Sequence, residues 1–270
     1  MLSRLFRRWV RRPPAVRSPP PLPRATLHDL LARHGLDDAH IPASAWLPPQ
    51  EPQSLGAGRW ALPLLDPAWC RALAARVDAL HHACATHGVT APEAPNSMNR
   101  YGIVLDTDGA VPILDLTPVR GRLAPVLARL FPEHHGASLD HHHGFIVRYA
   151  MDEDRALAFH ADDAEVTVNI GLDATHEGGS LWFEGARCAL HRDAPPQAAE
   201  RAEWRHTPGV ALLHAGADRH GAHPITRGTR HNLVVWMRSA TARQEGGPRP
   251  WGLEADCPPW CARARAGEVS

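Results

Sequence analysis

Residues 209–238 read GVALLHAGADRHGAHPITRGTRHNLVVWMR and predict two short β-strands joined by a turn-rich segment. The runs GVALLH and HNLVVWMR are apolar and β-branched, and Gly, Asp and Pro lie between them. Similar runs precede this segment: GFIVRYAM at 144–151, AEVTVNIGL at 164–172 and GSLWF at 179–183. Several short strands without intervening helical periodicity are typical of an antiparallel sandwich or jelly roll. We therefore expect a mainly β region after Asp140.

The sequence before this region predicts helices. LHDLLARHGL, at 27–36, has Thr26 or Asp29 available as a cap and ends at Gly35. In PAWCRALAARVDALHHACATHG, at 67–88, apolar residues recur every three or four positions and predict one buried stripe that includes two cysteines. A third helix is expected near PVRGRLAPVLARLF, at 118–131, where Pro125 either bends the helix or marks its start. The stripe in the second helix consists of Cys70, Leu73, Val77, Leu80 and Cys84.

These patterns divide the chain into four expected segments. Residues 1–25 are a disordered Arg/Pro-rich tail, 26–135 a helical support region, 136–240 the jelly-roll core and 241–270 a loop-rich C-terminal tail. The first segment holds seven arginines and no acid. A mitochondrial transit peptide and a basic membrane-surface helix are alternative interpretations of it. We expect a cytoplasmic protein, with a mitochondrial location as the alternative.

Composition excludes several classes of function. The 270 residues contain 29 basic and 29 acidic side chains, and every basic one is arginine. A lysine nucleophile, a Schiff base and a P-loop lysine are therefore excluded. Balanced charge argues against wholesale binding to nucleic acid, and the sequence has no apolar run of about 18 residues that could span a membrane. No pattern indicates an oligomeric state.

We interpret the cysteines and the run of three histidines as structural rather than catalytic. The five cysteines form no disulfide-style framework, and free thiols fit a reducing compartment. CPPWC, at 257–261, has one residue more than a C-x-x-C knuckle, so we interpret Cys257 and Cys261 as a lone structural pair rather than a metal site. His141–His143 are interpreted as a loop that enters the strand GFIVRY.

The segment AFHADD, at 158–163, is the strongest candidate for chemistry. His160 and Asp162 are two residues apart, so on an extended chain their side chains leave the same face, whereas Asp163 leaves the other. A third ligand from the segment 209–238 would complete a site of two histidines and one carboxylate, as in non-haem iron oxygenases. The candidates for that ligand are His214, His220 and His223.

Arg230 strengthens this interpretation. It begins an apolar strand ten residues after His220. The guanidinium of an arginine binds a carboxylate through two parallel charge-assisted hydrogen bonds, and a buried cation needs such a partner. A dicarboxylic ligand could reach the metal with one end and Arg230 with the other.

The order of these motifs resembles the Fe(II)/2-oxoglutarate-dependent dioxygenases of the prolyl 4-hydroxylase-like branch. That branch has R-Y at a strand end, then H-x-D, G-x-A-x-L-H, H-x-x-x-P-[VI]-x-x-G-x-R and a strand ending in Trp. This chain has Arg148-Tyr149, His160-Ala-Asp162, Gly209 to His214, His220 to Arg230, and Trp236. The resemblance covers about residues 95–240, and PNSMNRYG at 95–102 resembles one subgroup of the branch.

The resemblance implies that His160, Asp162 and His220 bind iron and that Arg230 binds the distal carboxylate of 2-oxoglutarate. His220 is preferred because it lies four residues before Pro224, as in the family motif; His214 and His223 are interpreted as structural or surface residues. The remaining candidates for contact with 2-oxoglutarate have structural alternatives. Tyr149 either hydrogen-bonds the cosubstrate or packs in the core, and Asn169 and Asn232 either line its pocket or lie at strand edges.

The fold implied is a double-stranded β-helix, or jelly roll, with the N-terminal helices packed on its outer sheet. The reaction implied is hydroxylation of a C–H bond coupled to conversion of 2-oxoglutarate and O2 into succinate and CO2, with ascorbate as a candidate reductant. Related halogenases lack the carboxylate ligand, so Asp162 favours hydroxylation. The substrate is either a peptide or a small metabolite. Two alternatives stay open: a cupin-like metalloenzyme with other chemistry, such as a zinc hydrolase, and a non-catalytic jelly-roll binding module.

Overall fold

The computed structural model describes residues 25–37, 39–96, 98–108, 110–244 and 257–261. Apart from Ala25, the expected Arg/Pro-rich tail lies outside the described residues. The first element is α1 (Leu27–Arg33), which begins with a reciprocal cap. Thr26 Oγ1 accepts from the Asp29 backbone N–H, and the Asp29 carboxylate accepts from the Thr26 backbone N–H. Both expected capping residues therefore act together.

The two longer helices form where the apolar spacing predicts them. Helix α2 (Pro67–His87) begins after the Asp66 cap and ends at Gly88, whose φ of 62° suits a residue without a side chain. The predicted stripe of α2, with Cys70 and Cys84 in it, is buried. Helix α3 (Thr117–Leu130) contains Pro125 in its interior, so this proline does not mark its start.

In the described residues, eleven strands form two antiparallel sheets. The larger sheet has seven strands in the order β2-β3-β12-β8-β15-β6-β4, and the smaller has four in the order β11-β10-β13-β7. The strands of the larger sheet are β2 (Gln53–Gly56), β3 (Arg59–Pro63), β4 (Ile103–Thr107), β6 (His141–Tyr149), β8 (Val166–Gly171), β12 (Val210–Ala215) and β15 (Arg230–Arg238). Those of the smaller sheet are β7 (Leu157–His160), β10 (Leu181–Ala186), β11 (Arg201–Trp204) and β13 (Asp218–Ala222).

Short elements complete the fold. The paired strands β1 (Ala39–His40) and β5 (Leu114–Asp115) are parallel, and β9 (Glu177–Gly178) pairs antiparallel with β14 (Ile225–Arg227). A short helix, α4 (Ala240–Gln244), follows β15. No helix in the described part of the chain is both long enough and apolar enough to cross a membrane.

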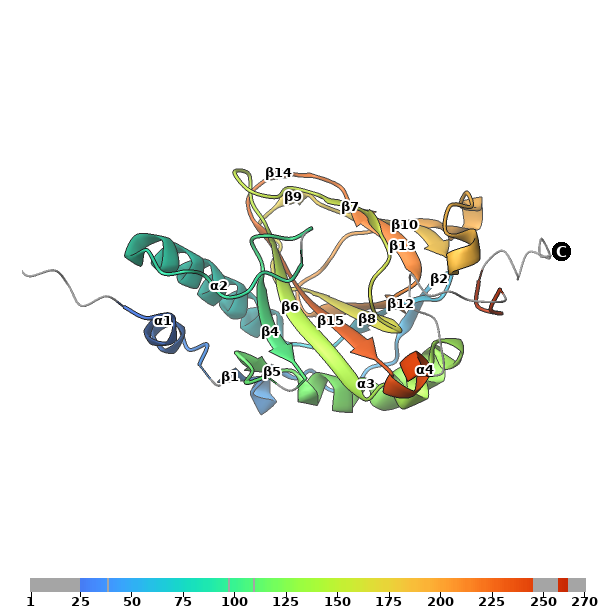
Figure 1. Ribbon diagram of the computed structural model, residues 1–270, viewed down its shortest axis with the longest axis horizontal. Coiled ribbons are helices and arrows are strands. Elements are labelled where there is room, and N and C mark those ends of the chain that lie inside the picture. Colours follow the sequence, from blue (N-terminus) through green and yellow to red (C-terminus); the bar gives the residue numbers. More distant parts are fainter. Residues whose placement is uncertain (1–24, 38, 97, 109, 245–256, 262–270) are drawn as a thin grey trace, which may run out of the picture.

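From β6 onward the chain alternates between the two sheets. Strands β6, β8, β12 and β15 lie in the larger sheet, and β7, β10, β11 and β13, which occur between them in sequence, lie in the smaller. Figure 1 shows β10 and β13 above the larger sheet and α3 below it. This alternation is that of a jelly roll, so the expected mainly β fold is confirmed.

The larger sheet has one face for the core and one for the site. Alternate residues such as Ile146, Leu233 and Val235 pack with Val77 of α2 and Leu123 of α3 in the main apolar cluster. The residues between them face the smaller sheet, because successive side chains of a strand point to opposite faces. The helices therefore pack on the outer face of the larger sheet, as expected.

Three expectations about local structure differ from what is observed. The region 26–135 is not only helical, because β2, β3 and β4 lie within it and extend the larger sheet. His141–His143 are not a loop: they begin β6 and pair with Trp236–Arg238 of β15. His142 is buried there and its Nε2 lies 2.9 Å from Asp106 Oδ2, which provides the polar partner that a buried imidazole needs. The expected loop-rich tail, 241–270, is not all loop, because residues 241–244 belong to α4; apart from 257–261, the rest of it lies outside the described residues.

Candidate active site

Two histidines lie side by side on neighbouring strands of the smaller sheet. His160 ends β7, His220 lies on β13, and the two are directly paired in the register of those strands. Their ring centroids are 4.3 Å apart. The Nδ1 atoms lie 2.8 Å from the backbone oxygens of Ala158 and Asp218, respectively. If each Nδ1–H donates to its carbonyl, both Nε2 lone pairs are available for a metal.

Asp162 completes the cluster from the turn after β7. Its backbone N–H donates to Gly216 O at 2.9 Å, which fixes the turn. Its Oδ1 lies 3.3 Å from His160 Nε2, and its Oδ2 lies 3.9 Å from His220 Nε2 and accepts from Thr167 Oγ1 at 2.6 Å. One ligand atom from each of His160, Asp162 and His220 lies within 4.8 Å of the others.

The protonation states of Asp162 and His220 suit a cation, whereas His160 must lose a proton to bind one: burial lowers its pKa, but Asp162 outweighs this and raises it. Burial lowers the pKa of His220 to about 3, so this imidazole is neutral near pH 7. Burial disfavours ionisation of Asp162, but His220 and His160 outweigh it and hold the pKa of this carboxyl below its usual range. A neutral imidazole and a carboxylate are the protonation states that bind metal.

The donor set fits iron(II). Two imidazole nitrogens and one carboxylate on one face of a metal leave the other positions open for small ligands. The hydrogen bonds that the three ligands make to the rest of the chain also suit a metal site. Backbone carbonyls orient both imidazole rings, and Thr167 orients the carboxylate.

Arg230 is a buried cation without a carboxylate partner among the described residues. It begins β15 opposite Tyr149, and its guanidinium lies 5.2 Å from the centroid of that ring. Its Nε donates to Asn232 Oδ1 at 2.9 Å, and one terminal nitrogen lies 3.5 Å from His206 Nδ1. The other terminal nitrogen is buried and has no hydrogen-bond partner in the described structure. Such a group is costly to bury unless a ligand completes it, and the fitting ligand is an anion.

The two asparagines hold this arginine in place. Asn232 Nδ2 donates to Asn169 Oδ1 at 2.8 Å, while Asn232 Oδ1 accepts from Arg230. Both side chains are buried, so neither asparagine lies at an exposed strand edge. Asn169 and Tyr149 line the pocket. Asn232 is not one of its lining residues and acts by accepting the hydrogen bond from Arg230.

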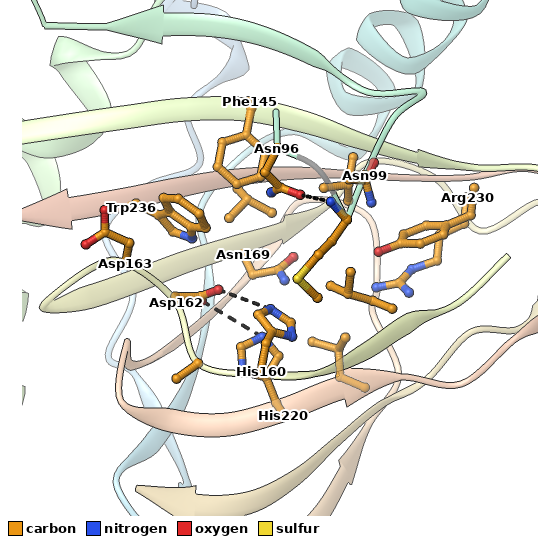
Figure 2. Close-up of a pocket in the computed structure, with 17 residues that line it drawn as sticks. Asn96, Asn99, Phe145, His160, Asp162, Asp163, Asn169, His220, Arg230 and Trp236 are labelled. Carbon is orange, nitrogen blue, oxygen red and sulfur yellow. Dashed lines mark hydrogen bonds and ion pairs between the residues drawn. The ribbon is translucent and has the colours of Figure 1, made fainter. Parts of the chain in front are cut away.

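A cavity of about 210 Å³ joins the metal-ligand cluster to Arg230. Figure 2 shows His160, Asp162 and His220 grouped in one part of the pocket, with Arg230 farther along it. Alternate residues of the neighbouring strands β6 and β15 line it: Phe145, Val147 and Tyr149 on β6, and Arg230, Val234 and Trp236 on β15. The pocket therefore lies between the two sheets of the jelly roll.

Of the rival residues, His223 lies away from the ligand cluster, whereas His214 packs beside it and Asp163 borders the same pocket. Asp163 is half-exposed and pairs with Arg238 and Arg243. The His223 side chain is 47% exposed and pairs with Glu203. His214 is fully buried rather than at the surface, with its Nε2 3.9 Å from Asp162 Oδ2.

Sequence reasoning missed His206 and Asn99. His206 lies on a loop of no recognisable motif yet is buried against Arg230, and Asn99 lines the pocket from the segment before β4. The string PNSMNRYG was part of the resemblance and could have pointed to Asn99; no sequence signal pointed to His206.

No protein-family model matches the chain, but curated proteins do. It is 45% identical over 150 residues to the 2-oxoglutarate and iron-dependent oxygenase domain-containing protein ICU11 of Arabidopsis thaliana, covering 56% of this chain and 38% of that protein. It is 38% identical over 187 residues to protein CP2 of the same description and organism, covering 69% and 47%. The human 2-oxoglutarate and iron-dependent oxygenase domain-containing protein 2 is 36% identical over 185 residues, covering 68% and 50%.

Among solved structures, a Pseudomonas putida prolyl-4-hydroxylase overlaps with a TM-score of 0.44 and 14% identity, covering 79% of this chain and 99% of that one. The chain spans about half the length of the curated relatives, or less. Over the region that it shares with them, this chain is homologous to the 2-oxoglutarate and iron-dependent oxygenase domain-containing proteins.

Proposed function

We propose that the chain is an Fe(II)- and 2-oxoglutarate-dependent oxygenase that hydroxylates a C–H bond of its substrate. The observation that carries this proposal is the presence, in one cavity, of a His/Asp/His cluster and a buried arginine with a terminal nitrogen that has no partner in the described part of the chain. The names of the relatives support the same chemistry.

His160, Asp162 and His220 would hold the iron. Bound iron would supply the redox chemistry that couples oxidative decarboxylation of 2-oxoglutarate by O2 to oxygen insertion, with succinate and CO2 as products. The contribution of the chain is to fix the ligands: the register of β7 and β13 sets the two rings, and Thr167 sets the carboxylate. This preorganisation keeps the ligand side chains in place before the metal binds.

Arg230 would bind the distal carboxylate of 2-oxoglutarate. Its buried terminal nitrogen is a charge-assisted donor in a site from which water is largely excluded. Asn232 holds the guanidinium through Nε, and Asn169 holds Asn232. Tyr149 packs against the guanidinium and borders the space that the cosubstrate would fill.

The structure weighs against both alternative functions. A zinc hydrolase could use the same three ligands, but it has no need of the buried arginine in the same cavity. A binding module without catalysis would not need a complete ligand set, and all three ligands are present.

We propose a peptide or a small metabolite as the substrate, and no nucleic acid, given the balanced charge. The cavity is narrow enough to admit a side chain or a small molecule rather than a folded surface. We further propose a cytoplasmic location, with a mitochondrial one as the alternative that follows if residues 1–25 are a transit peptide.

The direct test is succinate formation by the purified chain. We expect slow conversion of 2-oxoglutarate to succinate with Fe(II), O2 and ascorbate, and faster conversion when a pool of candidate peptides or metabolites contains the substrate. Mass spectrometry of that pool should show a product heavier by one oxygen atom. Succinate that forms equally well with zinc in place of iron, or no succinate at all with fully loaded enzyme, would refute the proposal.

A further inference from the structure

A second group of metal-ligating side chains lies outside the pocket. Cys188 and His191 follow β10, and Cys257 and Cys261 come from the described C-terminal segment, 69 residues beyond Cys188. One ligand atom from each of the four lies within 4.8 Å of the others. None of them lines the cavity that holds His160, Asp162 and His220. The interpretation of Cys257 and Cys261 as a lone pair is therefore wrong, because the fold adds two further ligands to it.

The distances among these atoms match the edges of a zinc tetrahedron. Zinc binds cysteine sulfur at about 2.3 Å and histidine nitrogen at about 2.0–2.1 Å, so the sulfur–sulfur edge is about 3.8 Å and the sulfur–nitrogen edge about 3.6 Å. The Cys188 and Cys257 sulfurs are 3.8 Å apart. The Nδ1 atom of His191 lies 3.3, 3.4 and 3.8 Å from the sulfurs of Cys188, Cys257 and Cys261. Cys188 and Cys257 are free thiols here, because their sulfurs lie farther apart than the disulfide bond length of about 2.05 Å.

Each pair of ligands is held on a tight turn. Cys188 caps the short 3-10 turn Ala189–His191, where the His191 N–H donates to Cys188 O at 3.1 Å. The Cys261 N–H donates to Pro258 O at 2.9 Å in the second turn. Short spacings of this kind, C-x-x-H and C-x-x-x-C on two separate segments, are how structural zinc sites are assembled from sequence.

The surroundings fit a structural site rather than a catalytic one. Cys188 and Cys261 are buried, and the cluster packs against Ala217 of the β12–β13 turn and against Trp260. The Trp260 ring lies 5.1 Å from that of His134, which follows α3. Four protein ligands leave no open position for a substrate. Three thiolates also favour zinc over the harder oxygen-binding cations.

We propose that Cys188, His191, Cys257 and Cys261 bind one structural zinc ion, which fastens the C-terminal segment to the β10 and β12–β13 side of the jelly roll. The ion crosslinks two segments far apart in sequence, so its binding free energy adds to the stability of the folded chain. This site is independent of the proposed iron site.

The test is the metal content of the untagged full-length chain, purified under reducing conditions. We expect one zinc per chain that withstands dialysis, and, in chain refolded with Co(II), the intense visible bands of tetrahedral, thiolate-bound cobalt. Cys257→Ser and Cys188→Ser should retain less than about a fifth of the parent zinc, whereas the control Cys84→Ala, a buried cysteine of α2, should retain all of it. Removal of zinc by a chelator should lower the melting temperature by about 5 °C or more.

A second variant separates this site from the first. His220→Ala should lose iron and keep zinc, and Cys257→Ser should do the reverse. Three results would overturn the proposal: parent chain that takes up no zinc under reducing conditions, zinc that disappears in His220→Ala but not in Cys257→Ser, or cobalt-loaded parent chain that lacks the tetrahedral thiolate bands. In any of these cases the four side chains form only a thiol–imidazole hydrogen-bonded cluster. The cobalt spectrum of the parent chain needs no variant, so a variant that fails to fold does not weaken the test.

Discussion

Replacing Arg230 by alanine should weaken 2-oxoglutarate binding and leave iron binding nearly intact. Arg230 has one buried terminal nitrogen without a partner among the residues that the structure describes, and a second that lies 3.5 Å from His206 Nδ1, while its Nε donates to Asn232. The distal carboxylate of the cosubstrate can therefore accept one strong charge-assisted hydrogen bond and compete for a second.

The magnitude follows from those two donors. One hydrogen bond to a charged group contributes about 1.5–3 kcal/mol, and each 1.4 kcal/mol is tenfold in affinity. Loss of the first donor alone should decrease the affinity for 2-oxoglutarate by about 10- to 100-fold. Loss of both donors should decrease it by roughly three powers of ten. Arg230→Lys should recover only part of the affinity, because an ammonium group cannot donate to Asn232 and to the carboxylate in the same geometry.

Anaerobic calorimetric titration of 2-oxoglutarate into metal-loaded chain measures this effect. The matched control is Arg227→Ala, which removes an exposed arginine that pairs with Glu177 and lies three residues before Arg230. Arg227→Ala should bind the cosubstrate as the parent does. An Arg230→Ala protein that is folded, binds iron and has unchanged affinity for 2-oxoglutarate would show that the anion goes elsewhere.

Three further predictions concern the ligands and the fold. Asp162→Ala should abolish succinate formation while shifting the melting temperature of the metal-free chain by only a few degrees. The control Asp163→Ala should stay active. An inactive Asp163→Ala beside an active Asp162→Ala would mean that the carboxylate ligand is misassigned. His220→Ala should lose iron in equilibrium dialysis and the half-exposed control His223→Ala should keep it, and equal affinities would contradict the assignment. Burial lowers the pKa of His231, but Asp173 and Asp78 outweigh it and raise that pKa above its usual value. The stability that His231 adds should therefore be fully present below about pH 6.5 and be lost as the pH rises through the raised pKa of His231. The difference in melting temperature between parent and His231→Gln should shrink with rising pH. A difference that stays constant with pH would refute this prediction.

The sequence predicts the elements that have a strong local pattern. The 3-4 spacing from Cys70 to Cys84 predicts the buried face of α2, and the β-branched runs predict β8, β12 and β15. The H-x-D spacing, together with the resemblance, indicates His160 and Asp162, which the fold brings to His220 through the register of β7 and β13. Elements with strong local periodicity and motifs with short spacing can be predicted, because residues close together in sequence determine them.

Contacts between distant segments could not be predicted in the same way. His206 reaches Arg230 from a loop with no motif, and the four ligands of the proposed zinc site come from two segments whose proximity depends on the whole jelly roll. His141–His143 look like a polar loop in sequence, but β15 offers them a pairing partner, and Asp106 and Thr107 of β4 satisfy two of their imidazoles. In each case tertiary contacts outweigh the local preference of the residues.

The central claim is that iron and 2-oxoglutarate bind together in the cavity between the two sheets. Its most direct test is the visible absorption spectrum of the chain under anaerobic conditions, with Fe(II) added first and 2-oxoglutarate second. We expect a weak charge-transfer band that appears only when both are present, that is lost in Asp162→Ala and that saturates at a higher cosubstrate concentration in Arg230→Ala. A flat spectrum from folded parent chain at saturating iron and 2-oxoglutarate would contradict it.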